Sequence, residues 1–386
     1  RSLRFIWIPE FSGSIPWAKQ HKDILDRTLC GINLDMVGLW LSKSGSYYCM
    51  HRTTMGNPHY LNDVAESFYH YMGATNKGFV ATGVGRPDAT KPVYSLTGSH
   101  DPFYYSINAH YGFSDHEVMN DWGVQVPAVI MITWPDNYYH TSGDRPSICD
   151  PTQLHRAIVL AAATAYTIAS ADEKGASAIA NEVSTGASKR MALKAAEDLA
   201  QLSLATADNL AAAYKRAKFN QDALLLNEQA TLESVMELAP NHPALKEQIA
   251  TLQGLLKEKG LNNQKEIDAA MKAQAALLGV APVKRIELTA EEKAAAKMFP
   301  RTTAKVKQTG YGVLQTVTKE LLEKHQLIEN GRSVIAHAGD IAKLTCTGKN
   351  SVLDIKKMQD AQFPDADSLT NIIRYIDVLK EAGLVE

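Results

Sequence analysis

Apolar residues gather in short unbroken runs in the first part of the chain. The clearest are Leu3–Ile8, Cys30–Leu41 and Val126–Thr133. Runs of this length are typical of strands that are buried on both faces of a sheet. Pro58–Gly73 and Pro151–Ala171 have the spacing of helices instead, the second with proline in its first turn. Strands that alternate with helices predict an α/β fold, a three-layer sandwich around a mixed, mostly parallel sheet.

The pattern changes after residue 172. Residues 173–285 are rich in Ala, Leu, Lys and Glu and poor in Gly and aromatic residues. This composition predicts an all-α region of antiparallel helical hairpins, with one break at the prolines near residue 240 and another at Gly260. Residues 286–386 begin with a linker and end in helical segments that look like a small winged-helix module. We therefore expect three parts, 1–172, 173–285 and 286–386.

Charge and composition exclude some functions. Among the 386 residues, 40 are Lys or Arg and 42 are Asp or Glu, so no strong field marks a binder of nucleic acid or of a membrane surface. Residues 301–386 carry twelve basic and eleven acidic side chains, which also disfavours a DNA partner for the winged-helix-like module. No apolar run reaches the roughly 18 residues of a membrane span. The charged faces of the helical region are expected to be solvated, and the region is expected to form homo-oligomers or to cover the rim of a site.

The first residues bear on every expectation about the site. The chain opens with Arg1 inside an apolar run that predicts a buried strand. A chain that begins within a core strand is expected to be a fragment or a processed product.

Three polar residues each follow an apolar run directly. Glu10, Asp35 and His140 lie where strands of the predicted sheet end. In an α/β sheet the loops at the carboxyl ends of strands carry ligand sites. One Glu, one Asp and one His form a donor set that suits zinc. Taken singly, Asp35 is equally well explained as a hydrogen-bonded turn carboxylate, whereas a lone loop histidine such as His140 is more often structural than a metal ligand.

Four segments together resemble a known family. They are PEFSGS (9–14), INLDMVG (32–38), SDHEVMNDWGVQVPAV (114–129) and YYHTSGDRPSICD (138–150). Their order and spacing are similar to those of the co-catalytic zinc exopeptidases (metallopeptidase family 28), which include bacterial leucyl aminopeptidases, glutamate carboxypeptidase II and the transferrin receptor. The resemblance covers about residues 1–170.

The resemblance implies a role for each matched residue. Asp35 would bind one zinc ion and His140 the other, and Tyr139 would steady the oxyanion that forms during hydrolysis. Ser114, Asp115 and His116 match a motif that shapes the pocket, so we expect them to support the site rather than to bind metal.

Glu10 departs from the family pattern. The family has two adjacent glutamates before the Gly-Ser turn, one a general base and the other a zinc ligand. This chain has Glu10 alone, between Pro9 and Phe11. Glu10 is therefore expected to act as the base or as a ligand, with the second role left open.

The resemblance implies a zinc-dependent aminopeptidase, which hydrolyses peptides from a free N-terminus. The family's His-x-Asp histidine and bridging aspartate precede the glutamate strand and have no counterpart here, so the chain would hold part of a two-zinc site. Two other functions fit the same fold, a non-catalytic scaffold or binding protein and a one-zinc transferase like the glutaminyl cyclases. Members of the family are often exported, which favours an extracytoplasmic location.

Overall fold

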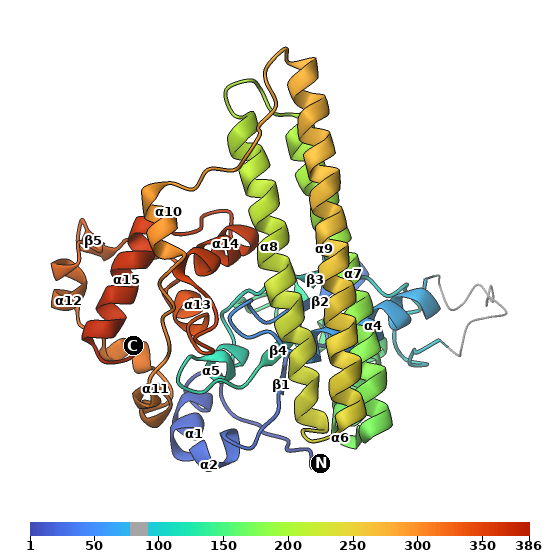
Figure 1. The fold of residues 1–386 in the computed structure, drawn as a ribbon. Coiled ribbons are helices and arrows are strands. Elements are labelled where there is room, and N and C mark those ends of the chain that lie inside the picture. Colours follow the sequence, from blue (N-terminus) through green and yellow to red (C-terminus); the bar gives the residue numbers. More distant parts are fainter. Residues whose placement is uncertain (78–91) are drawn as a thin grey trace.

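A computed structural model describes residues 1–77 and 92–386 of the chain (Figure 1). At its centre lies a four-stranded mixed sheet of order β1-β4-β2-β3. Strands β1 and β4 are parallel, β4 and β2 are antiparallel, and β2 and β3 are parallel. The four strands are β1 (Gly31–Asp35), β2 (Tyr47–His51), β3 (Tyr105–Asn108) and β4 (Ala128–Trp134). With the helices around it, this sheet makes the first part of the chain α/β, as the alternating pattern predicts.

The two faces of β1 meet different helices. Gly31 contacts Met119 of helix α5 (His116–Asn120), and the side chains of Asn33 and Asp35 point to the same side because strand residues alternate. Ile32, on the other side, packs on the main core with helices α4 (Leu61–Thr75) and α6 (Pro151–Ser170). The candidate polar residues of β1 therefore lie on the α5 face.

The predicted strand at Leu3–Ile8 is wrong. Residues 1–9 form no strand, and Phe5 and Trp7 are 73% and 87% exposed. The terminal amino group of Arg1 donates to the Ala169 carbonyl, so the segment begins beside the end of α6. This segment pairs with no strand in the described part of the chain. Without backbone hydrogen bonds to a neighbouring strand, an extended conformation of the segment is not stabilised as a strand.

Three long helices follow the sheet and stand together in Figure 1. They are α7 (Glu173–Ser203), α8 (Leu210–Ser234) and α9 (Pro243–Leu277). The predicted all-α region is confirmed, but the break at Gly260 is not, because α9 runs through it. A Cβ on Gly260 would lie 3.2 Å from Met191, so this glycine lets two helices approach closely. The predicted break near residue 240 is confirmed, since α9 begins at Pro243, and a further break, at 204–209, was not predicted.

A buried ion network joins these helices to the sheet. Arg190 of α7 donates to Asp63 of α4 at 2.6 Å and to Glu228 of α8 at 2.7 and 2.5 Å. The side chains of Asp63 and Glu228 are almost fully buried. The main apolar core is likewise shared, since it runs from the sheet through α4 and α6 into α7, α8 and α9.

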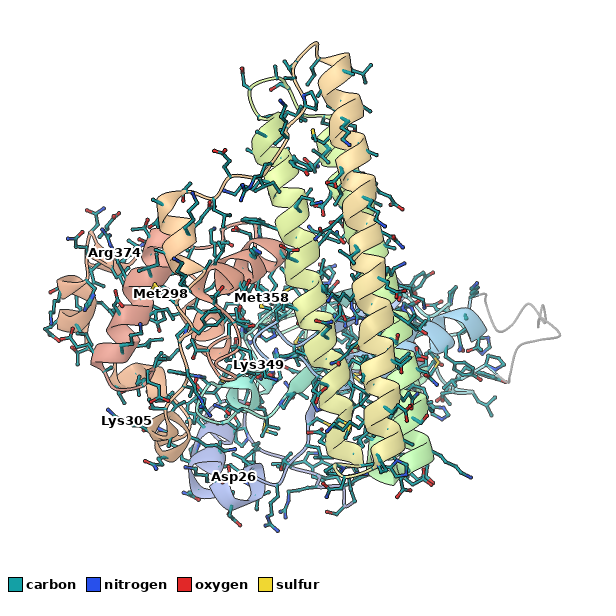
Figure 2. The ribbon with its side chains drawn as sticks, viewed as in Figure 1. Asp26, Met298, Lys305, Lys349, Met358 and Arg374 are labelled. Atoms are coloured by element: carbon teal, nitrogen blue, oxygen red, sulfur yellow. The ribbon has the colours of Figure 1, made fainter. Side chains whose placement is uncertain are left out.

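The last part of the chain is built from short helices around a core of its own. Met298 and Met358 belong to this region, and both contribute to its core (Figure 2). Asn330 and Gly331 have positive φ angles and form the turn of a small hairpin. The elements are α10 (Ala290–Ala295), α11 (Ala304–Thr309), η4 (Val313–Thr316), α12 (Lys319–Lys324), β5 (Ile328–Glu329), β6 (Arg332–Ser333), α13 (Ala338–Lys343), α14 (Val352–Gln362) and α15 (Leu369–Glu381).

This last region packs directly against the first. Lys22 donates to the carbonyl oxygens of Lys307 and Gln308 at the end of α11. A Cβ on Gly123 would lie only 1.9 Å from the carbonyl oxygen of Gly310, so the two backbones touch. The remaining short elements are α1 (Ser14–Gln20), α2 (Lys22–Leu25), α3 (Leu41–Ser44), η2 (Pro146–Ile148) and η3 (Val235–Leu238).

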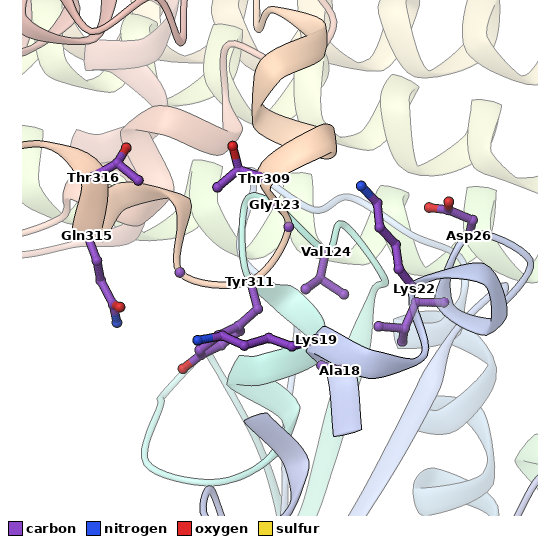
Figure 3. A pocket seen from close by; sticks show the side chains of 13 residues that line it. Ala18, Lys19, Lys22, Asp26, Gly123, Val124, Thr309, Tyr311, Gln315 and Thr316 are labelled. Carbon is purple, nitrogen blue, oxygen red and sulfur yellow. The ribbon is translucent and has the colours of Figure 1, made fainter. Parts of the chain in front are cut away.

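A cavity of about 460 Å³ opens at this joint (Figure 3). Lys19, Lys22 and Tyr311 are among its lining residues, and in Figure 3 Gln315 and Thr316 lie at the opposite side of the view from Lys22. The ammonium of Lys19 lies 5.8 Å from the centre of the Tyr311 ring. None of the site residues expected from the sequence lines this cavity.

None of the helices formed by residues 1–77 and 92–386 combines the length and the apolar character that a membrane crossing requires.

Candidate functional site

Asp35 is the last residue of β1, and a serine holds its side chain. The hydroxyl of Ser114 donates to Asp35 Oδ2 at 2.9 Å, and Asn33 donates from its amide to the Ser114 oxygen at 2.6 Å. Ser114 is buried in the loop before α5. The three side chains form a chain of hydrogen bonds that fixes the Asp35 carboxylate at the end of its strand.

Asp115 anchors the turn that carries Glu10. Its Oδ1 accepts from the backbone N–H of Phe11 at 2.8 Å and from the hydroxyl of Ser14 at 2.5 Å. Glu10 lies in this turn, just before α1, and its side chain is exposed. Ser114 therefore holds the Asp35 carboxylate, and Asp115, next to it in the same loop, holds the turn that carries Glu10, as supporting residues would.

His140 comes from the turn after β4 and lies in an aromatic stack. Its ring packs on Tyr139 at 3.7 Å between centroids, and Tyr139 meets Trp134 at 5.5 Å in an edge-to-face arrangement. Both Tyr139 and His140 are exposed. The backbone N–H of Thr133 donates to the carbonyl of Met36, so the end of β4 lies beside the end of β1.

Backbone strain gathers at the same segments. Phe11, Met36, Phe113 and His140 all have positive φ angles, of 48°, 50°, 79° and 54°. Each is a site residue or the direct neighbour of one, although only seven non-glycine residues of the described chain have such angles. A bulky residue in this region is strained by about 1–3 kcal/mol, and strain of this kind concentrates at functional sites.

The charges of these residues act on one another. Partial desolvation by the surrounding protein raises the pKa of Glu10 although its side chain is largely exposed, and the neighbouring carboxylates Asp35 and Asp115 raise it further. A hydrogen bond from Ser114 and the charge of His140 act in the opposite direction. Glu10, Asp35 and His140 are thus close enough to interact, and acidic groups outnumber basic ones among these neighbours. A bound cation would relieve that imbalance.

The third residue of the loop motif, His116, belongs to a different cluster. It is fully buried, its Nε2 donates to the Tyr111 carbonyl at 2.8 Å, and its Nδ1 has no partner among the residues that the structure describes. Burial lowers its pKa to about 4, and burial also lowers the pKa of His110, 5.5 Å away between ring centres, to about 3. His116 therefore supports the loop from behind as a neutral group.

The donor atoms do not converge on a single point. Among residues 1–77 and 92–386, no three His, Cys, Asp or Glu side chains are arranged closely enough to hold a metal ion. The chemistry of Glu10, Asp35 and His140 nevertheless fits zinc, which takes carboxylate oxygen and imidazole nitrogen. Side-chain rotations would be needed to bring the three together.

Comparisons of the chain with protein-family models, with curated proteins and with solved structures found no match.

Sequence reasoning missed two features of the site. Asn33 supports Ser114, and its position two residues before Asp35, on the same face of a strand, was a usable signal. The anchoring of the Phe11 and Ser14 turn by Asp115 had no such signal, since 101 residues separate Ser14 from Asp115. Only the fold brings them together.

Proposed function

We propose that this chain carries the site of a zinc-dependent aminopeptidase that acts on peptides with a free N-terminus. One observation carries the proposal. Within a single loop, Ser114 hydrogen-bonds the Asp35 carboxylate and Asp115 hydrogen-bonds the turn of Glu10, and the backbone of these segments is strained. Backbone strain next to carboxylates that outnumber their basic neighbours is typical of a site whose residues are held in place before a ligand binds.

Each residue has a part in this proposal. Asp35 would hold one zinc ion and His140 the other, and Glu10 would act as a further ligand or as the general base, so the three side chains supply part of a two-zinc site. Zinc supplies Lewis-acid chemistry, which polarises a carbonyl group and makes water a stronger nucleophile. Ser114 fixes the Asp35 carboxylate, and Asp115 fixes the turn of Glu10. The Tyr139 hydroxyl would donate to the oxyanion that develops on the scissile carbonyl.

The finer architecture is part of the proposal. We regard the sheet with its helices as part of a three-layer sandwich (1–172), followed by a helical region (173–285) that serves homo-oligomers or shields the site. For residues 286–386, the order of short helices around the β5–β6 hairpin supports a winged-helix-like module. Its near-neutral charge argues against nucleic acid as the partner. An extracytoplasmic location remains the favoured one.

The proposal is tested by metal content and by hydrolysis. The full chain, loaded with zinc and dialysed, is expected to retain zinc and to release p-nitroaniline from aminoacyl p-nitroanilides. The variant Asp35→Asn is expected to lose both properties, while Asp26→Asn, which changes an exposed carboxylate of an ion pair with Lys307, keeps both. Zinc binding without hydrolysis would overturn the aminopeptidase, and absence of zinc binding would overturn the metal site.

Two rival functions are separated by the same samples. The lack of a converged group of three ligands in the described residues favours a non-catalytic scaffold, for which Asp35→Asn would leave partner binding unchanged. The set of one Glu, one Asp and one His favours a one-zinc transferase of the glutaminyl-cyclase kind. A peptide with N-terminal glutamine would then be cyclised without being cleaved.

A further inference from the structure

The cavity at the joint between α2 and residues 309–316 is shaped by two distant parts of the chain (Figure 3). Its volume of about 460 Å³ lies within the roughly 300–1,000 Å³ that small-molecule sites occupy in proteins. Leu25 and Val124 supply apolar side chains to the lining, and Tyr311 supplies an aromatic ring. The cavity can therefore take a small organic molecule that has an apolar part.

Positive charge predominates at this cavity. Lys19 and Lys22 line it, and Asp26, an acidic residue of the same lining, lies 3.3 Å from the ammonium of Lys307 in an ion pair. Neither Lys19 nor Lys22 has a carboxylate within ion-pair distance in the part of the chain that the structure describes. The charges of these two lysines are therefore left for a ligand.

A second carboxylate near the cavity already has its partners. Asp121 accepts through Oδ1 from the backbone N–H of Gly123 at 2.8 Å, and through Oδ2 from that of Gly312 at 3.3 Å. Gly123 and Gly312 both line the cavity. Asp121 therefore fixes the wall, and two N–H donors oppose its charge.

The two ammonium groups are held differently. Lys22 donates to the carbonyl oxygens of Lys307 and Gln308, which fixes it at the wall and leaves one of its three N–H groups for a further acceptor. Lys19 is exposed, and its ammonium lies 5.8 Å from the centre of the Tyr311 ring, with the two side chains next to each other in Figure 3. A contact of this kind is weak at an exposed position, so Lys19 can turn to an anion without losing a strong partner.

We propose that this cavity binds an organic phosphate monoester, with its phosphate held by Lys19 beside the charge of Lys22 and its apolar part packed on Tyr311. A phosphate monoester carries about two negative charges at neutral pH, which matches the two ammonium groups, whereas a carboxylate carries one. Because α1 and α2 form one wall and residues 309–316 the other, the bound ester holds the last region of the chain on the first. The inference does not depend on the proposed aminopeptidase function.

Calorimetric titration of the full chain with phenyl phosphate tests the site. The protein is first treated with EDTA, since phosphate also binds zinc. We expect saturable binding of phenyl phosphate and about tenfold weaker binding of inorganic phosphate, which lacks the ring, and of benzoate, which carries one charge. Benzylamine, with the opposite charge, should not bind. Absence of saturable phenyl phosphate binding, or a preference for benzylamine, would overturn the site, and equal affinity for inorganic phosphate would overturn the organic ester as its ligand.

Variants locate the ligand. Lys19→Met should weaken phenyl phosphate binding about tenfold or more, and Lys19→Arg, which keeps the charge, should bind within about threefold of the wild type. Lys257→Met, on the exposed face of α9, and Asp35→Asn, outside the cavity lining, should bind like the wild type. Phenyl phosphate should also raise the Tm of the wild type but not that of Lys19→Met. Unchanged affinity in Lys19→Met would contradict the assignment, and loss of binding in Asp35→Asn would place the ligand at the candidate metal site instead.

Discussion

The hydroxyl of Ser114 donates to the carboxylate of Asp35 across 79 residues of chain, at 2.9 Å. The contact joins the end of β1 to the loop that also anchors Glu10 through Asp115. A carboxylate that is held in this way loses little rotational freedom when it binds a metal ion. We therefore expect the Ser114–Asp35 hydrogen bond to raise the affinity for a metal ion.

Replacing Ser114 by alanine is therefore expected to weaken zinc binding about tenfold. The variant leaves Asp35 free to rotate and Asn33 without its acceptor. Competition with a chromophoric chelator measures the change, and Ser147→Ala, at an exposed position, should bind zinc like the wild type. Equal affinity in both variants would show that Ser114 does not organise the site.

Tyr139→Phe is expected to lower kcat roughly 100-fold with little change in KM, because the phenol donates only when charge develops on the substrate oxygen. The phenyl ring preserves the stack on His140, so zinc content should stay the same. Steady-state kinetics give the answer, with Tyr138→Phe as the neighbouring control. A rise in KM alone would assign Tyr139 to substrate binding.

His116 should make stability depend on pH. Burial lowers its pKa to about 4, with His51 and Lys343 acting in the same direction and Asp115 against it. The unfolded chain takes up a proton below about pH 6.5 and the folded chain does not, so stability falls as the pH drops from 6.5 towards 4. The difference approaches about 3 kcal/mol at pH 4.

The variant His116→Gln cannot titrate and should flatten this dependence. Urea unfolding at pH 7, 6, 5 and 4 measures the free energy of unfolding of both proteins. Because groups far from His116 titrate equally in both, the difference between them reports His116 together with its effect on the neighbouring His110. Parallel curves would contradict the assignment.

Two glycines should respond in opposite ways to alanine. At Gly123 a Cβ would meet the Gly310 carbonyl at 1.9 Å, so Gly123→Ala should destabilise the protein by about 1–3 kcal/mol. At Gly254, inside α9, a Cβ would have no described atom within 4 Å apart from its chain neighbours and the backbone of its own helix. Gly254→Ala should therefore stabilise the protein by about 0.5–1 kcal/mol through helix propensity. Thermal unfolding of the two variants checks both signs, and stabilisation by Gly123→Ala would contradict the close approach.

Arg190→Met should destabilise the protein by about 3–5 kcal/mol. The change leaves Asp63 and Glu228 buried without their main partner. Urea unfolding measures the loss, and Lys257→Met on the exposed face of α9 should change stability by less than about 0.5 kcal/mol. An equally small effect at Arg190 would mean that water reaches the two carboxylates.

The elements that sequence reasoning found are those whose signal is local. The strand Ala128–Trp134 and the helix Pro151–Ser170 follow from an unbroken apolar run and from a proline at a helix start. Gly260 misled because a glycine that permits close helix packing looks the same in sequence as one that ends a helix. The run at Leu3–Ile8 misled because a strand requires a partner, which no local pattern supplies.

The features of the candidate site also divide into those with a local signal in the sequence and those without one. Glu10, Asp35 and His140 were predicted as site residues because each follows an apolar run, and the charges of Asp35 and His140 do act on Glu10. Their role as ligands stays a prediction. The strain at Phe113 could not be foreseen, since φ angles depend on how the surrounding loop is held. The sequence also did not reveal that His116 would turn away from Asp35 towards Tyr111 and His110.

The small core beneath α1 links two distant parts of the molecule. Ala18 and Leu25 pack there with Val118 of α5, and Tyr311 lies against the same core. Helix α1, which follows the Glu10 turn, thus packs both against α5, which follows the loop of Ser114 and Asp115, and against Tyr311 of the last region of the chain. A partner, or a ligand in the adjoining cavity, that drew Tyr311 away would therefore be expected to loosen the support of Glu10 and to alter the zinc affinity of the proposed site, which it would never touch.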